Sequence, residues 1–276
     1  MGQADLHLHT TYSDGAMTVP ALLDAVAGRG ELAVIAVTDH DTIAGAEFAR
    51  RIARRGRYPV EVIVGEEVTT RDGHLVGLFL SEAIPPGMSA AETVAAIHAQ
   101  GGVAFAPHPF FNDRPRRRRR TMDSIGHLAA ALPLDAIEVE NSTPGLEWAN
   151  VRARRFALRH RLPMLGASDA HILAAVGKSH TCFQGRTAAD LRRAILAGEV
   201  GPGTRRYNPG ELLRYLLFWL GYGRPITVRG GDGRGVRRWA RRSRSRRAAT
   251  RSGLILPPTV RSGPNPGTIR SPGRQT

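Results

Sequence analysis

The chain has 276 residues, 42% of them hydrophobic, which is typical of a folded globular protein with one large α/β domain or two small ones. Residues 201–276, with 17 arginines and two acidic residues, account for the whole formal net charge of +15. Residues 1–200 are therefore formally neutral, and the overall charge says little about binding of nucleic acid by the folded part of the chain.

The first half of the chain alternates strand-like and helix-like segments. Ala4–His9 predicts a strand, and Thr18 can cap a helix that ends near Arg29. An Asp72-Gly73 turn separates two later strands. The strands expected next are 32–38, 60–66, 74–80 and 103–106, and the helices are 42–55 and 89–100.

The second half continues this alternation after a loop that contains Arg114 and the arginine run 116–120. Helices are expected at 122–132, 146–160 and 187–198, and strands at 136–139 and 164–167. Such repeated alternation predicts a parallel sheet that is closed or partly closed into a barrel. The C-terminal ends of the strands form the functional face of such barrels.

The composition changes after about residue 205. Residues 1–205 are expected to form the barrel domain, and residues 206–223 an apolar helix that covers part of it. Residues 224–276 consist largely of arginine, glycine, serine and proline, so they cannot bury enough apolar surface to fold alone. We expect this tail to be disordered.

Histidines and carboxylates gather at the ends of the predicted strands. His7 and His9 are two residues apart, so on a strand they point to the same face and can reach one ion. Asp169 and His171 repeat this spacing. Imidazole and carboxylate are the ligands of borderline divalent metals, so the pattern predicts a centre with more than one ion. The candidate ligands are His7, His9, Asp14, His40, Glu66, His74, His108, Asp169 and His171.

Other residues have simpler explanations. His98, His127 and His160 lie within predicted helices and are expected to be structural. Asp39 could cap a helix. Glu67 is expected to be structural beside Glu66, although an inverted strand register would exchange the two. His108 precedes Pro109, whose ring favours an extended backbone at the residue before it.

The order of these motifs resembles one known family. Asp5-Leu6-His7-Leu8-His9-Thr10 with Ser13-Asp14-Gly15, Val37-Thr38-Asp39-His40-Asp41, Gly65-Glu66-Glu67, His74, His108-Pro109 and Ser168-Asp169-Ala170-His171 are similar to the motifs of the polymerase and histidinol phosphatase (PHP) superfamily. The resemblance spans about residues 4–200. It implies a distorted, TIM-like (β/α)7 barrel with a trinuclear centre of Zn, Mn or Fe.

The resemblance also implies a set of ligands for each ion. One ion takes His7, His9, Glu66 and Asp169; a second shares Glu66 and takes His74 and His108; a third takes Asp14, His40 and His171. Glu66, Asp169 and His108 are the expected catalytic residues. Every ligand position is filled by a usable residue, which argues against an inactive copy.

The expected activity is hydrolysis of a phosphomonoester, of a nucleotide or of an oligonucleotide end, by a metal-activated hydroxide. A 5′–3′ exonuclease that uses the same site is the first alternative. The second is a nucleic-acid-binding module that acts through the arginine-rich tail. Lys178, His180 and Arg114 are candidates to contact the phosphate, and the arginine run after Arg114 is either a solvated loop or a flap.

Partners and location follow from weaker signals. The single cysteine, Cys182, excludes an intrachain disulfide and suits a reducing cytoplasm. No apolar run approaches the ~20 residues that span a bilayer. The tail is a coding-biased extension, an arm for DNA or RNA, or an anchor on anionic lipid, in that order of preference. The substrate, the native metal and the oligomeric state stay open.

Overall fold

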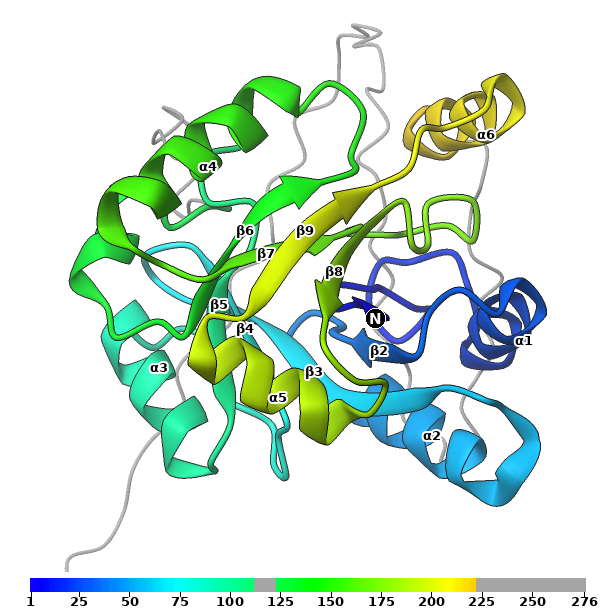
Figure 1. Ribbon diagram of the computed structural model, residues 1–276, viewed down its shortest axis with the longest axis horizontal. Helices are drawn as coiled ribbons and strands as arrows, with labels where there is room; N and C mark the ends of the chain where they lie inside the picture. Colours follow the sequence, from blue (N-terminus) through cyan, green and yellow to red (C-terminus); the bar gives the residue numbers. More distant parts are fainter. Residues whose placement is uncertain (112–122, 222–276) are drawn as a thin grey trace, which may run out of the picture. The chain divides into compact units, whose positions relative to one another are not determined.

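A computed structural model describes residues 1–111 and 123–221 of the chain (Figure 1). Its strands form one sheet in the order β7-β6-β5-β4-β3-β2-β1-β8-β9. The strands are β1 (Gly2–Asp5), β2 (Val34–Val37), β3 (Glu61–Thr69), β4 (His74–Leu78), β5 (Val103–Ala106), β6 (Ala136–Asn141), β7 (Met164–Ala167), β8 (Ser179–Phe183) and β9 (Val200–Thr204).

Four of the helices, α1, α3, α5 and α6, begin at a residue whose side chain caps them. Thr18 accepts a hydrogen bond from the Ala21 amide at the start of α1, and Ser89 forms a capping box with Glu92 at the start of α3. The helices are α1 (Val19–Arg29), α2 (Ala44–Ile52) continued by a π-helical turn (Ala53–Arg57), α3 (Ala90–Ala99), α4 (Glu147–His160), α5 (Ala188–Ala197) and α6 (Pro209–Trp219), with a 3-10 helix at Gly126–Ala131.

The first seven strands close into a distorted barrel. β1, β2 and β3 run parallel, as do β5, β6 and β7. The extensions of β1 and β7 meet in a parallel bridge between Leu8 and Ala170, which closes the first seven strands into a ring. β8 and β9 form an antiparallel hairpin beside β1. The expected distorted TIM-like α/β barrel is thus confirmed.

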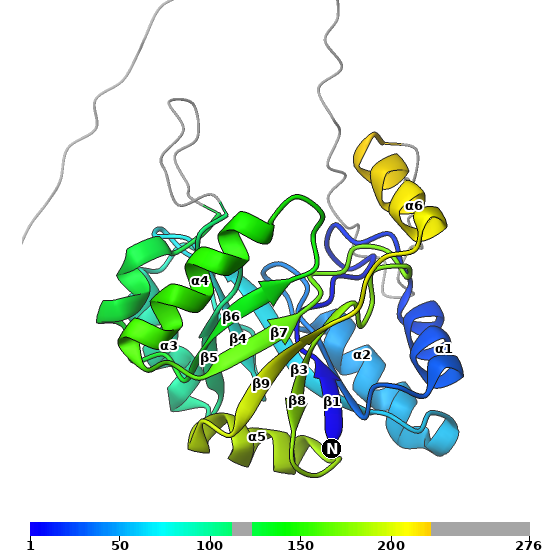
Figure 2. The same ribbon diagram turned by 45° about the horizontal axis from the view of Figure 1, so that its top comes forward.

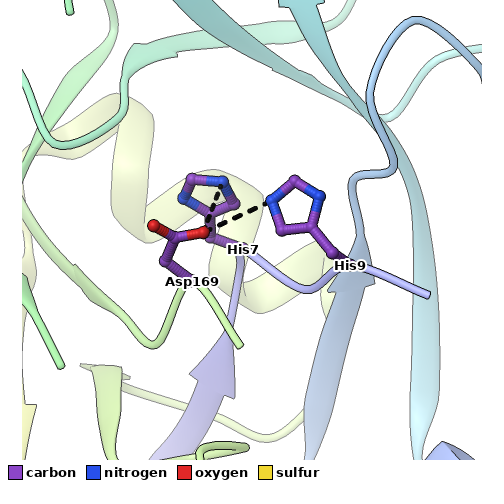
Figure 3. A group of neighbouring side chains, drawn as sticks. All are labelled: His7, His9 and Asp169. Carbon is purple, nitrogen blue, oxygen red and sulfur yellow. Dashed lines mark ion pairs between the residues drawn. The ribbon is translucent and has the colours of Figure 1, made fainter. Parts of the chain in front are cut away.

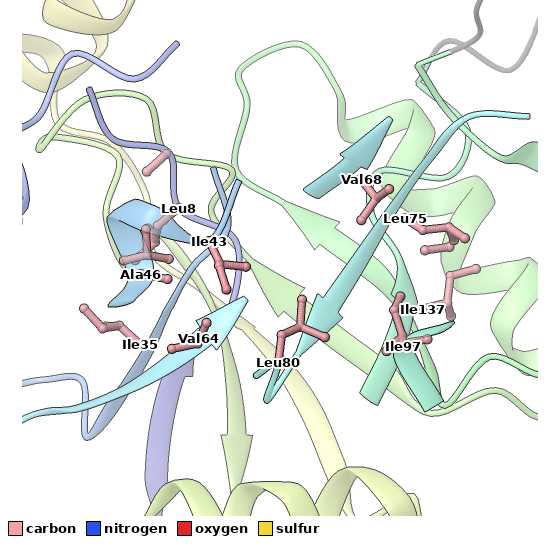
Figure 4. Close-up of a cluster of buried hydrophobic side chains, with 14 of the residues drawn as sticks. Leu8, Ile35, Ile43, Ala46, Val64, Val68, Leu75, Leu80, Ile97 and Ile137 are labelled. Carbon is pink, nitrogen blue, oxygen red and sulfur yellow. The ribbon is translucent and has the colours of Figure 1, made fainter. Parts of the chain in front are cut away.

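Two hydrophobic clusters follow from the alternation of side chains along the strands. Val34 and Ala36 of β2 point into the barrel, where residues of α5 such as Leu191 and Ile195 complete the packing. Ile35 and Val37 point outward, into the cluster between the sheet and the helices (Figure 4). Because both faces of these strands are apolar, composition alone does not distinguish the inner face from the outer one.

Several expectations about the sheet were wrong. The sheet is not purely parallel, because β4 runs antiparallel to both β3 and β5. β8 and β9 were not expected: Ser179–Phe183 is mostly polar, and Val200–Thr204 contains a proline and two glycines. The helix expected at 122–132 is a shorter 3-10 helix, Gly126–Ala131.

α6 differs from the other helices because few of its side chains are buried. Tyr215 is its only buried residue, whereas Leu213 and Leu216 are about half exposed. The expectation that this helix covers part of the barrel therefore holds only for one narrow face. The arginine run 116–120 and the tail 224–276 lie outside the described residues. Across the described segments, every helix is too short or too polar to cross a membrane.

Candidate metal centre

Two short motifs meet at the rim of the barrel. The Leu8–Ala170 bridge aligns the His7-Leu8-His9 segment with Asp169-Ala170-His171, and the His9 amide donates to the Ala170 carbonyl at 3.0 Å. Leu8 and Ala170 point into the outer hydrophobic cluster. The residues on either side of them therefore point the other way, into the site. Asp169 Oδ1 lies 3.6 Å from His7 Nε2 and 3.4 Å from His9 Nε2 (Figure 3).

The register of β3 places Glu67, and not Glu66, in this site. Ile63 belongs to the cluster inside the barrel. Glu67 is four residues further along the same strand, so its side chain points to the same inner face. Glu66 lies on the opposite face, with Val64 and Val68, and accepts a hydrogen bond from the Ile84 amide at 2.7 Å. The assignment of Glu66 as bridging and catalytic ligand was therefore wrong by one residue.

Glu67 lies at the centre of a group of imidazoles. Its side chain is 1% exposed, and a parallel bridge to His40 fixes its backbone. Both oxygens of the Glu67 carboxylate have histidine neighbours, so this carboxylate is in the position expected of a ligand that bridges two metal ions. The nitrogens nearest to its oxygens are His74 Nδ1 at 2.9 Å, His9 Nε2 at 3.1 Å, His7 Nε2 and His108 Nε2 at 3.2 Å, and His40 Nδ1 at 3.4 Å.

Strand direction explains how His74 reaches the rim. Parallel strands present their C-terminal ends there, but His74 is the first residue of β4. Because β4 is antiparallel to β3, its N-terminal end lies at the same rim, and Thr69 pairs with His74. His108 follows β5 with a φ of 26°, so the extended backbone expected before Pro109 is not found.

Asp14 forms the outer edge of the site. Its carboxylate lies 3.2 Å from His171 Nε2, 3.5 Å from His9 Nδ1 and 3.8 Å from His40 Nε2. The Asp14 side chain is 48% exposed, so the site is open to solvent here. Asp39 does not cap a helix: it accepts hydrogen bonds from Thr10 and Ser13 and so holds the loop that carries Asp14.

The charges of these groups are strongly coupled. Burial alone would raise the pKa of the Glu67 carboxyl, but the surrounding imidazoles outweigh it and hold this pKa well below its usual range. Burial alone would lower the pKa of His9, but Asp169 and Glu67 raise it to about 10. Without ions, the carboxylates therefore favour protonated histidines, and divalent cations can take the place of those protons.

The donor set fits divalent metal ions. Both ring nitrogens of His9 are fully enclosed by protein and make no well-aligned hydrogen bond, although carboxylate oxygens lie 3.1–3.5 Å away. Unpaired buried nitrogens are costly unless they bind a ligand, and imidazole is a common metal ligand. Four overlapping triads have ligand atoms within 4.8 Å of one another: His7-His9-Asp169, His7-Glu67-His108, His9-Asp14-His171 and His9-His40-Glu67.

Several residues that support this set of ligand candidates were not predicted from the sequence. Glu138 of β6 points into the barrel, where its carboxylate lies 3.0 Å from His7 Nδ1 and accepts hydrogen bonds from the His108 amide and the Asn141 side chain. Asp5 accepts from the Ser168 amide and hydroxyl, and burial raises its pKa to about 6. The signal for Glu138 was its position on the inner face of β6.

Lys178 and His180, which were predicted to contact the phosphate, have other partners in the structure. Lys178 Nζ lies 2.6 Å from Glu211 of α6, which makes it part of the attachment of that helix. His180 is buried, and its Nδ1 lies 3.3 Å from the Gly177 carbonyl, away from the metal-ligand candidates. Arg114 lies outside the described residues. Neither Lys178 nor His180 is therefore placed to meet a phosphate at the rim.

Two family models match the chain: the PHP domain over residues 5–111 and the PHP-associated region over residues 147–200. An uncharacterized protein, MJ1587 of Methanocaldococcus jannaschii, is 35% identical over 150 residues, which cover 51% of this chain and 82% of that one. Relatives with a named activity match over less of their length. They include the 3′,5′-nucleoside bisphosphate phosphatase of Chromobacterium violaceum (41% identical, 31% of this chain, 30% of that one) and the 5′-3′ exoribonuclease Rnm of Escherichia coli (40%, 27% and 26%).

The fold is also found among solved structures. A two-domain protein of Bacteroides vulgatus, described as containing a predicted PHP-like metal-dependent phosphoesterase, superposes with a TM-score of 0.59. It is 20% identical, and the superposition covers 78% of this chain and 69% of that one. The matched regions include all the metal-ligand candidates, whereas Glu138 lies between the two regions. On these grounds, the chain belongs to the PHP domain family of metal-dependent phosphoesterases.

Proposed function

We propose that the chain hydrolyses phosphomonoesters of nucleotides or of oligonucleotide ends with up to three divalent ions. The observation that carries this proposal is the Glu67 carboxylate, which is buried among five imidazoles and flanked by Asp14 and Asp169. One metal ion needs far fewer ligands than this set provides. The relative named as a nucleoside bisphosphate phosphatase supports a nucleotide as the substrate.

The residues divide into three overlapping ligand groups. His7, His9, Glu67 and Asp169 would hold one ion, Glu67 with His74 and His108 a second, and Asp14 with His40 and His171 a third. Bound ions supply two things: they neutralise phosphate oxygens and they lower the pKa of bound water. Zn, Mn and Fe all accept this nitrogen and oxygen donor set.

The protein's own residues orient these groups. Glu138 accepts a hydrogen bond from the His7 Nδ1–H group, which leaves His7 Nε2 free to bind an ion. His171 Nδ1 lies 2.9 Å from the Asp169 carbonyl, which leaves its Nε2 on the side of Asp14. These contacts fix the imidazole rings before any ion or substrate binds, so little reorganisation is needed.

The test is an assay of the full chain after reconstitution with Zn, Mn or Fe. We expect release of inorganic phosphate from nucleoside monophosphates or bisphosphates, and metal bound in a ratio above one ion per chain by elemental analysis. The absence of bound metal after reconstitution, or of phosphate release from any nucleotide by the metal-loaded protein, would contradict the proposal.

A 5′–3′ exonuclease is the second candidate, supported by the relatives named as 5′-3′ exoribonucleases. The two activities differ in product. A phosphatase releases inorganic phosphate from a 5′-phosphorylated oligoribonucleotide and leaves its length unchanged, whereas an exonuclease releases mononucleotides and shortens it. Gel analysis of a labelled 5′-phosphorylated RNA separates the two.

A further inference from the structure

We propose that the Phe218–Trp219 end of α6 forms a stacking subsite for the base of a nucleotide bound at the metal centre. This inference rests on the proposed function, because it takes the ester at the histidines to be a nucleotide. The ring centroids of Trp219 and Phe218 lie 5.7 Å and 6.1 Å from that of His171. His171 itself stacks on His9 at 4.3 Å, so the aromatic pair directly adjoins the predicted ligands.

The aromatic pair lies where the site opens to solvent. Trp219 is 51% exposed, and Asp14, which also contacts His171, is 48% exposed. A phosphate held at the histidines would leave the rest of its ester at this edge. A planar base there could lie against the Trp219 ring, since aromatic rings attract one another at centroid separations of roughly 4.5–7 Å.

The helix is attached firmly enough to present these rings. Its first turn is closed by a capping box between Asn208 and Glu211, and Glu211 is paired with Lys178 at 2.6 Å. Tyr215, the buried residue of the helix, packs against Tyr207 with a centroid separation of 5.9 Å. α6 lies at the end of the barrel opposite to α5 (Figure 2).

The chemistry of this edge favours a neutral planar group over a second phosphate. Lys178, which attaches this helix, is already paired with Glu211, and the Phe218 and Trp219 rings pack edge to face and contribute apolar surface. Base stacking on aromatic rings is strong and tolerates any base. α6 begins after residue 200, where the family-model matches end.

The test compares variants of the full chain loaded with metal. The quantity measured is the ratio of kcat/KM for AMP to kcat/KM for glycerol phosphate, which has no ring. We expect Trp219→Ala to lower this ratio about tenfold, within the range reported for loss of one base–aromatic stack. Trp219→Phe should retain most of the ratio, whereas Trp219→Leu, which keeps apolar bulk without an aromatic face, should not.

Leu213→Ala is the matched control, because Leu213 is 57% exposed on the same helix and has no ring on which a base could stack. It should leave the ratio as in the parent chain. An equal ratio in the parent chain and Trp219→Ala, or an equal loss in Leu213→Ala, would overturn the proposal. So would a Trp219→Leu ratio equal to that of Trp219→Phe.

A second measurement separates this inference from the proposed function. Adenosine carries no phosphate, so its binding to the full chain by isothermal titration does not depend on hydrolysis. We expect adenosine to bind the parent chain and Leu213→Ala alike, and Trp219→Ala about tenfold more weakly. If no phosphate ester is hydrolysed but adenosine binds in this pattern, the subsite is supported and the proposed reaction is contradicted. If esters are hydrolysed but adenosine binds Trp219→Ala as tightly as the parent chain, the proposed reaction is supported and the subsite is contradicted.

Discussion

Glu66 and Glu67 are neighbours with opposite surroundings. Glu67 contacts imidazoles, whereas Glu66 accepts the Ile84 amide, and burial raises the pKa of Glu66 to about 7. We expect Glu67→Gln to bind metal at least tenfold more weakly and to lose most phosphatase activity, because an amide is a poor bridging ligand. Elemental analysis and phosphate release measure the two effects.

Glu66→Gln is the control for that change. At neutral pH the Glu66 carboxyl is already partly protonated, and a glutamine oxygen can still accept from the Ile84 amide. Its metal content and activity should stay within a few-fold of the parent. Greater metal loss from Glu66→Gln than from Glu67→Gln would mean that the register of β3 is the other way round.

Glu138 acts on the site through His7. Its Oε2 accepts from His7 Nδ1, and its Oε1 accepts from the His108 amide and the Asn141 side chain. Those two donors would hold a glutamine oxygen in place, so the glutamine NH2 group would face His7 and favour the tautomer with the proton on Nε2. That tautomer cannot bind an ion through Nε2, so Glu138→Gln should weaken metal binding about 10- to 100-fold. Competition with a chelator of known affinity gives the number. Unchanged metal affinity in a folded variant would refute the orienting role.

The residue types of the candidate ligands were predictable from the sequence, but the strand face on which each side chain lies was predictable for only some of them. The two-residue spacing in His7-Leu8-His9 and Asp169-Ala170-His171 set their common face without knowledge of the fold. Glu67 could not be distinguished from Glu66 in this way, because the apolar run before them has no alternation. Glu138 was missed for a different reason: its role depends on His7, which is 131 residues away in the sequence.

At the scale of elements, α6 is attached by an ion pair of Lys178, a residue for which the sequence predicted a different role. Lys178 was expected to meet phosphate, but it is paired with Glu211. As an attachment, the pair predicts similar effects of Lys178→Met and Glu211→Gln: each should lower the free energy of unfolding by about 1 kcal/mol, since both side chains are only partly buried.

A double-mutant cycle by urea unfolding measures this coupling. If Lys178 bound the substrate phosphate instead, Lys178→Met alone would raise KM strongly, and Glu211→Gln would not. Similar KM values in the two variants are expected.

The long, periodic elements of the barrel could be predicted, but its irregular strands could not. β2 and β5 are continuous apolar runs, which is the pattern of strands buried on both faces. β9 contains Gly201, Pro202 and Gly203 and is a strand only because β8 offers it a partner. The direction of β4 was signalled by the Asp72-Gly73 turn, since a short turn joins antiparallel strands.

For the whole molecule, ions and protons compete for one set of groups. The raised pKa of His9, about 10 against an ordinary 6.5, stabilises the ion-free protein below pH 6.5, and this contribution is lost as the pH rises toward 10. Bound ions need neutral imidazoles, so their contribution grows over the same range. The gain in Tm on adding metal should therefore increase from pH 6 to pH 8.

Differential scanning calorimetry at pH 6, 7 and 8, with metal and with a chelator, measures this gain. Each proton displaced by an ion adds about 1.4 kcal/mol of stabilisation per pH unit, at a fixed excess of metal. A gain in Tm that shrinks with pH would show that the ions do not displace protons from these imidazoles.

The bridge between Leu8 and Ala170 also sets an order of events during translation. His7 and His9 leave the ribosome about 160 residues before the strand extension that aligns them. Until then one edge of β1 has no partner, because both Ala170 and β8 are still to come. A ribosome-bound chain that stops before residue 169 thus holds the His7-Leu8-His9 motif without the Asp169-Ala170-His171 motif that faces it, so the full set of candidate ligands forms only after both motifs have been made.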